Sequence, residues 1–370
     1  MRIAYIVNHL GSSGVNQVVA DLVSVFTSRG HECVVCYLKD CDTPMDYACD
    51  TMRLSAVTDL MGDFEVIHAH GLGPMLYVAR HRRALSHRQD GRQRPLFVTT
   101  LHCYCFQDLP SLYGRLKGCL MGCAYLLSTR WQDRVVCLSK DMMHYYARWI
   151  GRGKLRYVYN TRILPSQESI TFEADDRKLV ENLKVWHEQG CHVIGMNGVL
   201  IYRKGVDLML RALQLLNQDG DRYRLALVGD GKDKDVFVKL SEDLGLEGKV
   251  LFAGHRQDAY RFLPHYDVLA MPSHSEGFPL SLLEAAAYGR RVVVSELPIV
   301  KECFKFHDTD KPDISVFKIT TNSDQTIQGL AAAVKMVMAD DDMGKRLQLC
   351  FKRELAPQKF YERYMLAYKI

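Results

Sequence analysis

MRIAYIVNHLGSSGVNQVVADLVSVFTS, residues 1–28, begins with an unbroken apolar run at Ile3–Val7 and continues through a glycine-containing turn. Its second half, Val15–Ser28, carries apolar residues three and four positions apart, which is the period of an amphipathic helix. A short apolar run without alternation is typical of a parallel strand that is buried on both faces. These residues therefore predict a strand, a loop and a helix in succession.

The same succession of strand and helix recurs along the chain. In the first half we expect strands at 33–38, 66–69, 96–101, 134–138 and 155–159, and helices at 74–85 and 141–150. After the less patterned residues 161–171, a second series has strands at 192–197, 224–228, 250–252, 268–271 and 291–294, with helices at 206–216, 232–244 and 280–288. Alternation of this kind specifies parallel sheets with helices on both faces, so the predicted class is α/β.

The length of the chain fits two domains of this kind. It has 370 residues, whereas single cores stop growing at about 250–300 residues. We expect a Rossmann-like domain at 1–165, a second one at 172–355, and a C-terminal helix at 356–370 that packs back on the first domain. If the two doubly wound domains face each other, the carboxyl ends of their strands meet at an interdomain cleft, where open α/β sheets bind ligands.

The composition excludes several classes of protein. Hydrophobic residues make up 48% of the chain and charged residues 25%, so disorder is not expected. The formal net charge of +5 is too small to indicate a nucleic-acid partner, although it suits phosphorylated ligands or an anionic membrane. The twelve cysteines are scattered through apolar segments and are expected to be reduced thiols without a metal. The N-terminal apolar run is too short for a signal peptide or a membrane span, so we expect a cytoplasmic protein.

The segment that carries the chemistry is SHSEGFPLSLLEAAAYG, residues 273–289. Glu276 precedes a Gly-Phe-Pro turn, and Glu284 lies two turns into a helix of nearly all apolar residues. Burial of a carboxylate is costly unless hydrogen-bond donors meet it, and sugar hydroxyls are such donors. Free backbone N–H groups of Phe278, Leu280 and Ser281, at or near the helix start, suit a diphosphate. For either glutamate alone, a turn cap or an exposed helix position is an equally good interpretation.

Taken as a whole, this segment resembles the E-G-F-x-L-x-x-x-E signature of the retaining GT-B glycosyltransferases of family four. The resemblance implies the GT-B fold and a nucleoside-diphosphate sugar as donor. It also implies that Glu276 contacts the donor sugar, with a catalytic role, and that Glu284 holds the ribose hydroxyls. The further donor-binding residues that the resemblance implies lie between the two glutamates in the sequence and are Gly277, Phe278, Pro279 and Leu280.

A basic segment, NGVLIYRKGVD at 197–207, follows a predicted strand and opens a helix, where phosphates bind well. It resembles the family's G-R-x-x-x-x-K-G element, beginning with Gly198 as a donor-binding residue. Lys204 matches the lysine of that element, but Val199 stands where the arginine is expected. We expect Arg203 to substitute for that arginine, so that Arg203 and Lys204 both bind the donor and act in catalysis. A solvated basic loop is the alternative interpretation.

Shorter motifs complete the predicted donor site. Val228–Lys232 resembles the family's V-G-x-G element, and residues 252–256 resemble the strand and loop that line the base pocket. Gly11–Val15 resembles the glycine loop of the first domain, with Ser13 in place of one glycine. The residues that these motifs add to the predicted donor site are Gly14, Gly229, Gly231, His255 and Arg256.

A histidine follows one of the predicted strands of the first domain. Residues 99–102, Thr-Thr-Leu-His, resemble the family's T-x-H element, whose histidine lies near the anomeric region of the donor sugar. The resemblance implies a catalytic role for His102. A histidine that only completes the core after an apolar strand is the alternative.

The resemblance also implies a mechanism. The acceptor attacks on the face that the leaving group occupies, and the leaving phosphate helps to deprotonate it, while Arg203, Lys204 and helix N–H groups stabilise the developing charge. No metal and no other cofactor is then required. UDP is favoured over GDP as the nucleotide of the donor.

The acceptor is expected on the first domain. A basic run at Arg80–Arg94 precedes Leu109–Leu127, which mixes leucines with Arg115 and Lys117. A basic, amphipathic surface binds anionic lipid, which predicts peripheral contact with the inner face of the cytoplasmic membrane. The acceptor would then be a glycan or a lipid-linked glycan of surface polysaccharide biosynthesis. A solvated helix followed by an ordinary core helix explains the same residues equally well.

Other functions fit the residues less well. A sugar-nucleotide epimerase or a phosphorylase does not account for the string from Glu276 to Glu284, and a dinucleotide oxidoreductase would need G-x-G-x-x-G after its first strand. The alternative is a catalytically silent GT-B subunit that binds a partner glycosyltransferase or an acceptor protein. It stays open because Ser13 and Val199 depart from the family pattern.

Overall fold

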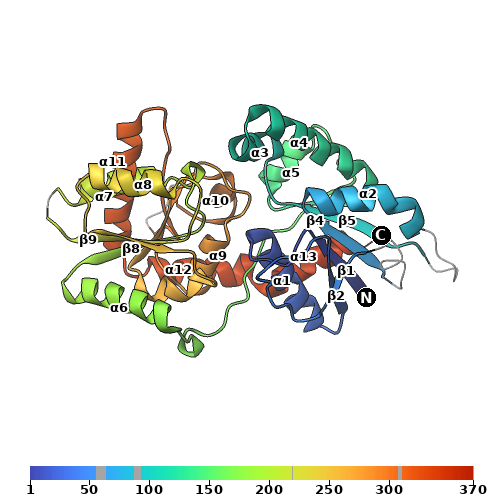
Figure 1. Cartoon of the computed structure of the whole chain (residues 1–370), viewed down its shortest axis with the longest axis horizontal. Coiled ribbons are helices and arrows are strands. Elements are labelled where there is room, and N and C mark those ends of the chain that lie inside the picture. Colours follow the sequence, from blue (N-terminus) through green and yellow to red (C-terminus); the bar gives the residue numbers. More distant parts are fainter. Residues whose placement is uncertain (56–63, 87–92, 219, 307–310, 370) are drawn as a thin grey trace. The chain divides into compact units, whose positions relative to one another are not determined.

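The computed structural model describes residues 1–55, 64–86, 93–218, 220–306 and 311–369. The chain divides into two compact units, each with a sheet of its own (Figure 1). Unit 1 comprises Met1–Ile163 and Leu355–Ile370, and unit 2 comprises Leu164–Glu354. Each sheet is parallel and carries helices, so the predicted α/β class with two doubly wound sheets is confirmed.

Unit 1 contains a seven-stranded sheet in the order β3-β2-β1-β4-β5-β6-β7, in which every neighbouring pair is parallel. The strands are β1 (Arg2–Val7), β2 (Glu32–Tyr37), β3 (Asp50–Arg53), β4 (Val66–His70), β5 (Leu96–Leu101), β6 (Arg134–Cys137) and β7 (Leu155–Tyr157). The helices are α1 (Gly14–Thr27), α2 (Leu72–Ser86), α3 (Cys105–Tyr113), α4 (Arg115–Ser128), α5 (Lys140–Tyr146) and α13 (Pro357–Tyr368). Strands β4 and β5 are buried at every position, as their apolar runs predict.

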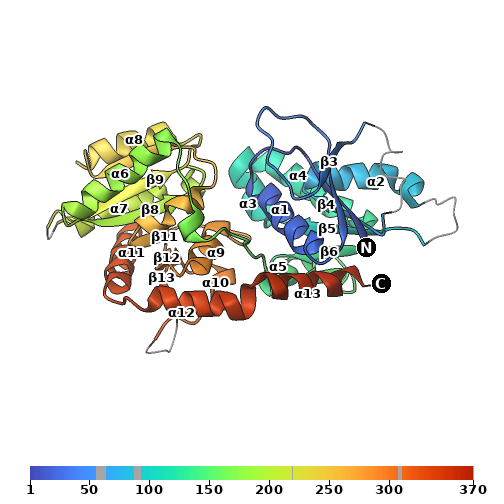
Figure 2. The same cartoon turned by 90° about the horizontal axis from the view of Figure 1, so that it is seen from below.

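The C-terminal helix α13 lies against unit 1 (Figure 2). Aromatic side chains make this contact, with the ring of Tyr368 centred 5.5 Å from that of Phe26 in α1. The hydroxyls of Tyr364 and Tyr368 lie 3.1 Å from Thr100 Oγ1 and 2.8 Å from His68 Nδ1, respectively. Helix α13 is therefore tied by hydrogen bonds to β4 and β5, two central strands of the sheet.

Unit 2 contains a six-stranded parallel sheet in the order β10-β9-β8-β11-β12-β13. The strands are β8 (His192–Asn197), β9 (Tyr223–Val228), β10 (Val250–Gly254), β11 (Val268–Met271), β12 (Val292–Ser295) and β13 (Ser315–Phe317). The helices are α6 (Ala174–Glu188), α7 (Val206–Leu216), α8 (Lys234–Asp243), α9 (Leu280–Ala287), α10 (Pro298–Cys303), α11 (Ser323–Met338) and α12 (Met343–Cys350). Figure 1 shows α7, α8 and α11 on one face of this sheet and α6 and α12 on the other. Buried residues of α7 and α11 form a core with the sheet.

Most predicted elements lie within two residues of their observed bounds, but some expectations were wrong. The helix expected at 141–150 ends at Tyr146. The amphipathic stretch 109–127 is divided between α3 and α4 at Gly114, whose φ of +84° breaks the helix. The helices α6, α10, α11 and α12 and the short strands β3 and β13 were not predicted from the sequence.

Candidate active site

Glu276 lies in the loop between β11 and α9 and is only 8% exposed. Lys204 Nζ donates a hydrogen bond to Glu276 Oε1 at 2.5 Å, and Arg203 Nη1 lies 3.5 Å from Oε2. Burial by itself raises the pKa of this carboxyl, but the two cations outweigh it and hold the pKa below its usual range. The charge cluster formed by Arg203, Lys204 and Glu276 is therefore ionised and carries one net positive charge.

The backbone places the two cations next to the glutamate. Arg203 and Lys204 lie in a single turn of 3-10 helix that leads into α7 through Gly205, at φ +69°. A Cβ at Gly205 would collide with the carbonyl oxygen of Pro272, so only glycine fits there. The His274 N–H donates to the Arg203 carbonyl oxygen at 2.8 Å, which joins the basic turn to the loop that carries Glu276.

Three predicted donor-site glycines hold neighbouring loops together. The N–H of Gly198 donates to the Val228 carbonyl oxygen at 3.0 Å, at the ends of β8 and β9. A Cβ at Gly229 would collide with the carbonyl of Gly198, and one at Gly231 would collide with that of Leu200. The structure thus gives Gly229 and Gly231 a packing role between these loops, which the motif alone did not indicate.

A small cavity opens beside the charge cluster, at the carboxyl ends of β8 and β11. Helix α9 begins there at Leu280, and its first turn has no side-chain cap, since Pro279 precedes it. Phe278 is buried, whereas Glu284 lies one turn further along α9 and is partly exposed. The cavity is lined by Met196, Asn197, Gly198, Val199, Leu200, Lys204, Val206, Ala270, Met271, Ser273 and Ser281.

His255 and Arg256 follow β10, as the base-pocket motif requires, but Arg256 has another partner. Its Nε lies 3.1 Å from Oδ1 of Asp176 in α6, and Arg261 Nη2 lies 2.7 Å from Oδ2 of the same carboxylate. Asp176 is buried and needs this compensation. A polar cavity of about 400 Å³ includes these residues together with Glu173, Asp258 and others. Arg256 thus has a structural role that sequence reasoning missed.

In unit 1, His102 directly follows β5 and meets His70, the last residue of β4. His70 Nδ1 lies 3.0 Å from His102 Nε2, and we call these two residues the histidine pair. Burial lowers the pKa of His102 to about 4, so its ring is neutral at physiological pH. Sequence reasoning missed His70, although the His-Ala-His at 68–70 ends a predicted strand in the same way as His102.

The glycine loop of unit 1 precedes α1. Gly14 is the first residue of that helix, and the Ser13 hydroxyl accepts a hydrogen bond from the Asn16 N–H at 3.1 Å. Ser13 is therefore the N-cap of α1, which gives a physical reason for a serine where the family pattern has glycine.

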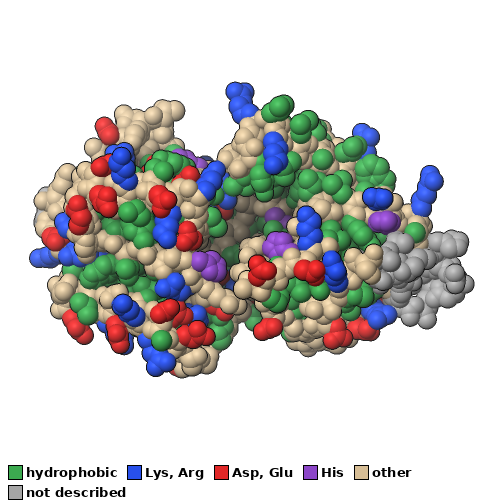
Figure 3. Space-filling view, viewed as in Figure 1, with side chains coloured by type: hydrophobic (Ala, Val, Ile, Leu, Met, Phe, Trp, Pro, Cys, Tyr) green, Lys and Arg blue, Asp and Glu red, His purple; other side chains and the backbone are tan. Residues whose placement is uncertain are grey.

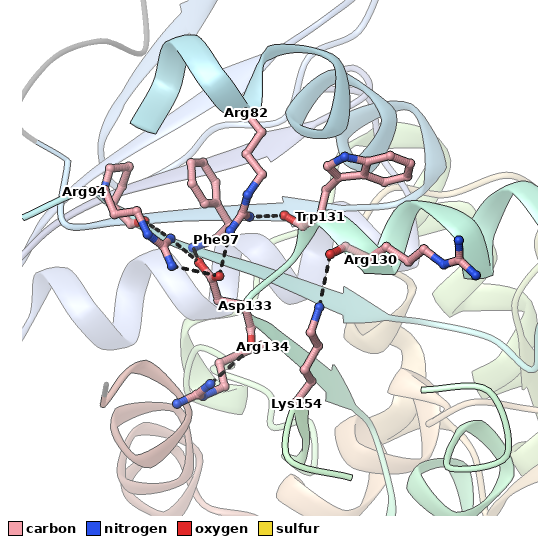
Figure 4. Close-up of polar contacts among 9 residues, drawn as sticks. Arg82, Arg94, Phe97, Arg130, Trp131, Asp133, Arg134 and Lys154 are labelled. Atoms are coloured by element: carbon pink, nitrogen blue, oxygen red, sulfur yellow. Dashed lines mark hydrogen bonds and ion pairs between the residues drawn. The ribbon is translucent and has the colours of Figure 1, made fainter. Parts of the chain in front are cut away.

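Part of the basic run in unit 1 forms ion pairs inside the fold (Figure 4). Arg82 Nη2 and Arg94 Nη1 lie 2.8 and 2.7 Å from the two carboxylate oxygens of Asp133. Burial would raise the pKa of Asp133, but hydrogen bonds from Arg94, the Phe97 N–H and Arg82 lower it to about 2. Arg82 and Arg94 thus form ion pairs with Asp133, and these pairs were not part of the expectation that the basic run faces a membrane. The residues of the run outside the described part of the chain are His87, Arg88, Asp90 and Arg92.

Neither a metal-binding cluster nor a membrane-spanning helix occurs among the described residues. No group of three or more His, Cys, Asp or Glu side chains among them is arranged to hold a metal ion. No helix within the described ranges is long and apolar enough to cross a membrane.

Comparisons with known proteins agree with this architecture. A family model described as Glycosyltransferase Family 4 matches residues 12–161, and one described as Glycosyl transferases group 1 matches residues 184–348. The O-antigen biosynthesis glycosyltransferase WclY of Escherichia coli is 27% identical over 317 residues, which make up 82% of each chain.

Two solved structures have a similar fold. HepE of Anabaena, in complex with UDP and glucose, aligns with a TM-score of 0.73 at 18% identity over 100% of this chain and 99% of that one. WaaG, a glycosyltransferase involved in lipopolysaccharide biosynthesis, aligns with a TM-score of 0.67 at 14% identity over 99% of this chain and 98% of that one. With the family models matched in both units, the chain belongs to the GT-B glycosyltransferases of group 1 and family 4, a retaining family of enzymes.

Proposed function

We propose that this glycosyltransferase moves a sugar from UDP to a glycan or lipid-linked glycan of surface polysaccharide biosynthesis, with retention of configuration. The charge cluster of unit 2 carries the proposal, since it sets two cations beside the start of α7 and a cavity at the strand ends. That arrangement suits a diphosphate. UDP is favoured over GDP because HepE was solved with UDP, and a surface glycan is favoured because WclY is an O-antigen enzyme.

In the proposed reaction, the bond between the sugar C1 and the β-phosphate oxygen breaks, and negative charge develops on the leaving UDP. Lys204 and Arg203 stabilise this charge, so the step needs no metal. The acceptor oxygen attacks C1 from the same face and passes its proton to the leaving phosphate. Glu276 is ionised and accepts hydrogen bonds from hydroxyls of the donor sugar. These hydroxyls compete with Lys204 Nζ for the carboxylate oxygens of Glu276.

The other donor contacts follow from the same assignment. Glu284 would accept hydrogen bonds from the ribose hydroxyls, while the N–H groups of Leu280 and Ser281 in the first turn of α9 would bind the diphosphate. His255 would contact the base. His102, neutral at physiological pH, would bind a hydroxyl of the transferred sugar.

A thermal-shift panel of UDP- and GDP-sugars tests the donor site, because a ligand that binds only the folded state raises the melting temperature. We expect one UDP-sugar to stabilise the protein, and the Glu284→Ala variant to lose most of that shift. The Glu242→Ala variant on α8 is the control, because no motif assigns that residue to the donor. Absence of a shift with every nucleotide would contradict the donor site and favour a silent subunit.

We propose further that the α3–α4 hairpin of unit 1 rests on an anionic membrane, at the inner face of the cytoplasmic membrane. Helix α4 is packed in an unusual way, because its glycines face α3 and its leucines face outward. A Cβ at Gly118 would collide with the backbone of Pro110, and one at Gly122 would lie 2.7 Å from the Phe106 ring. The hairpin can pack closely only in this orientation.

The outward face of α4 is apolar. Leu116 is 78% exposed, Leu120 is 63% exposed, and Leu127 lies on the same face. Figure 3 shows hydrophobic side chains gathered over this part of unit 1. Exposed Arg115 and Lys117 flank the leucines and add the charge that anionic headgroups attract. A lipid-linked acceptor would be reached at such a surface.

Vesicle flotation tests this surface. The wild-type protein should float with vesicles that contain phosphatidylglycerol and less with phosphatidylcholine alone, and the double variant Leu116→Ser, Leu120→Ser should stay unbound. Leu349→Ser on α12 is a matched control, because Leu349 is also 63% exposed. If the protein instead forms a dimer that the double variant abolishes, a second copy covers the face and the membrane proposal is wrong.

A further inference from the structure

The two members of the histidine pair differ in their exposure to solvent. His70 is 2% exposed, and its Nε2 is buried without a hydrogen-bond partner among the described residues. His102 is partly exposed, and its Nε2 is the atom that faces His70 Nδ1 at 3.0 Å. Only Nδ1 of His102 therefore remains to meet a ligand.

The proton positions on the two rings are coupled. A neutral imidazole has one N–H and one lone pair, so a contact between two ring nitrogens needs one of the two atoms to carry the proton. Burial lowers the pKa values of both rings, with His68 and His102 adding to the effect at His70. Both rings are thus neutral, and the tautomer of His70 dictates that of His102.

Two arrangements satisfy this condition. If His102 Nε2 donates, His70 must carry its own proton on Nε2, which leaves a buried N–H with no acceptor. If His70 Nδ1 donates, Nε2 of His70 keeps only an unpaired lone pair. Orphaned N–H groups are the rarer defect in protein interiors, because an unmet donor forfeits its full hydrogen bond. The second arrangement is therefore favoured.

From this geometry we propose that His70 is a positioning residue, which donates its Nδ1–H to His102 Nε2 and makes His102 present Nδ1–H to the substrate. The proposal rests on the role proposed above for His102 in binding the transferred sugar. It adds that His102 acts as a hydrogen-bond donor to an oxygen of the transferred sugar, and that it does not accept a proton through Nε2.

The surroundings of His70 hold its ring in place. The ring of His68 is centred 4.1 Å from it, and His68 has both nitrogens engaged, by the Tyr368 hydroxyl at 2.8 Å and the Thr100 hydroxyl at 2.9 Å. Because Tyr368 belongs to α13, the C-terminal helix supports the histidine pair through His68. This packing helps to hold the His70 ring in the orientation that faces His102.

The direct test is nitrogen-15 NMR of the protein labelled at histidine, with the His102 signals assigned by their loss in His102→Gln. Protonated and unprotonated ring nitrogens have well separated shifts. The proposal predicts a protonated Nδ1 and an unprotonated Nε2 in His102. The reverse pattern would overturn it, whatever the activity of the protein.

Kinetics supply the second readout. The amide of Asn can place an N–H near the position of His Nδ1, so His70→Asn should keep kcat/KM within about threefold, whereas His70→Leu should lower it about tenfold, mainly through kcat. UDP-induced thermal stabilisation, which reports on unit 2, should be unchanged in both variants. Equal losses in Asn and Leu variants would mean that His70 only packs, which contradicts the proposal. If the NMR pattern is as predicted but His102→Gln has wild-type activity, the proposed role of His102 fails and the tautomer assignment stands.

Discussion

The charge cluster of unit 2 and the histidine pair of unit 1 both lie at the carboxyl ends of parallel strands, and each includes a buried side chain, Glu276 and His70. Burial disfavours the charged form in both regions, but the outcome differs. Glu276 stays ionised because Lys204 and Arg203 outweigh the cost of its burial. His102 is neutral because burial lowers its pKa and no carboxylate in the described part of the chain opposes this effect. The partner of a buried group, more than burial itself, decides whether it carries charge.

This difference matches two chemical tasks. A leaving diphosphate gains negative charge, which fixed cations stabilise. A sugar hydroxyl stays neutral throughout, and a neutral imidazole can bind it without attracting the phosphate. Substitutions that exchange or remove the partners should therefore separate the two regions.

The largest effect is expected for Lys204→Met, which keeps most of the length of the side chain but removes its charge. It should lower kcat by about 10²–10³-fold, because an electrostatic contact with developing charge is lost. Lys204→Arg should lose less, since the charge remains. Steady-state assays of UDP release would measure both, and equal activity of Lys204→Met and wild type would contradict the role of the cluster.

The next effect concerns stability without catalysis. Asp133→Asn should lower the free energy of unfolding by about 1–3 kcal/mol, because Arg82 and Arg94 lose the carboxylate that pairs them. Urea unfolding measures this loss. Asp341→Asn is the matched control. The Asp341 carboxylate also pairs with an arginine, at 3.1 Å, but it is 97% exposed, so this substitution should leave the free energy of unfolding almost unchanged. Equal effects of the two substitutions would show that burial of Asp133 is unimportant.

A third effect depends on pH. The folded-state pKa of His102 is about 4 and the ordinary value is 6.5, so between these values the unfolded chain binds a proton that the folded chain does not. The stability that neutral His102 contributes is therefore present above pH 6.5 and is lost as the pH falls towards 4. From pH 7.5 to 5.5, the wild type should lose about 1 kcal/mol more than His102→Gln in urea unfolding. Parallel pH dependences would show that His102 titrates normally.

The smallest effect is expected at Ser13. Replacing the N-cap of α1 by alanine should cost about 1 kcal/mol, and Ser13→Gly should cost only a few tenths. Thermal unfolding measures both. An alanine variant as stable as the wild type would mean that the serine is present for another reason, such as contact with the donor.

The sequence predicted the central strands well because they are buried on both faces, so that apolar runs such as Ile3–Val7 mark them clearly. Helix α11 was not found, because no motif marks it and its second half, residues 330–338, is apolar except for Lys335 and therefore lacks a clear helical period. The segment from Glu276 to Glu284 was found because its spacing is specific and local.

Pairings between distant residues were not predictable in this way. The sequence around Arg82 and Arg94 does not indicate that Asp133 is their partner. Likewise, the sequence around Arg256 does not indicate that it pairs with Asp176. His70 was missed for the same reason, since its contact with His102 exists only because β4 and β5 are neighbours. Periodicity reveals which face of an element is buried, but the partners come from the order of the strands.

The most direct test of the central claim, that the charge cluster holds the diphosphate of the donor, is calorimetric titration of UDP into the wild type, Lys204→Met and Lys345→Met. Lys345 is an exposed lysine of the same unit that pairs with Asp342. If the cluster holds the diphosphate, Lys204→Met should weaken UDP binding by at least about tenfold, as expected for the loss of one charged hydrogen bond, while Lys345→Met should bind UDP as the wild type does. Equal affinity of all three proteins would contradict it.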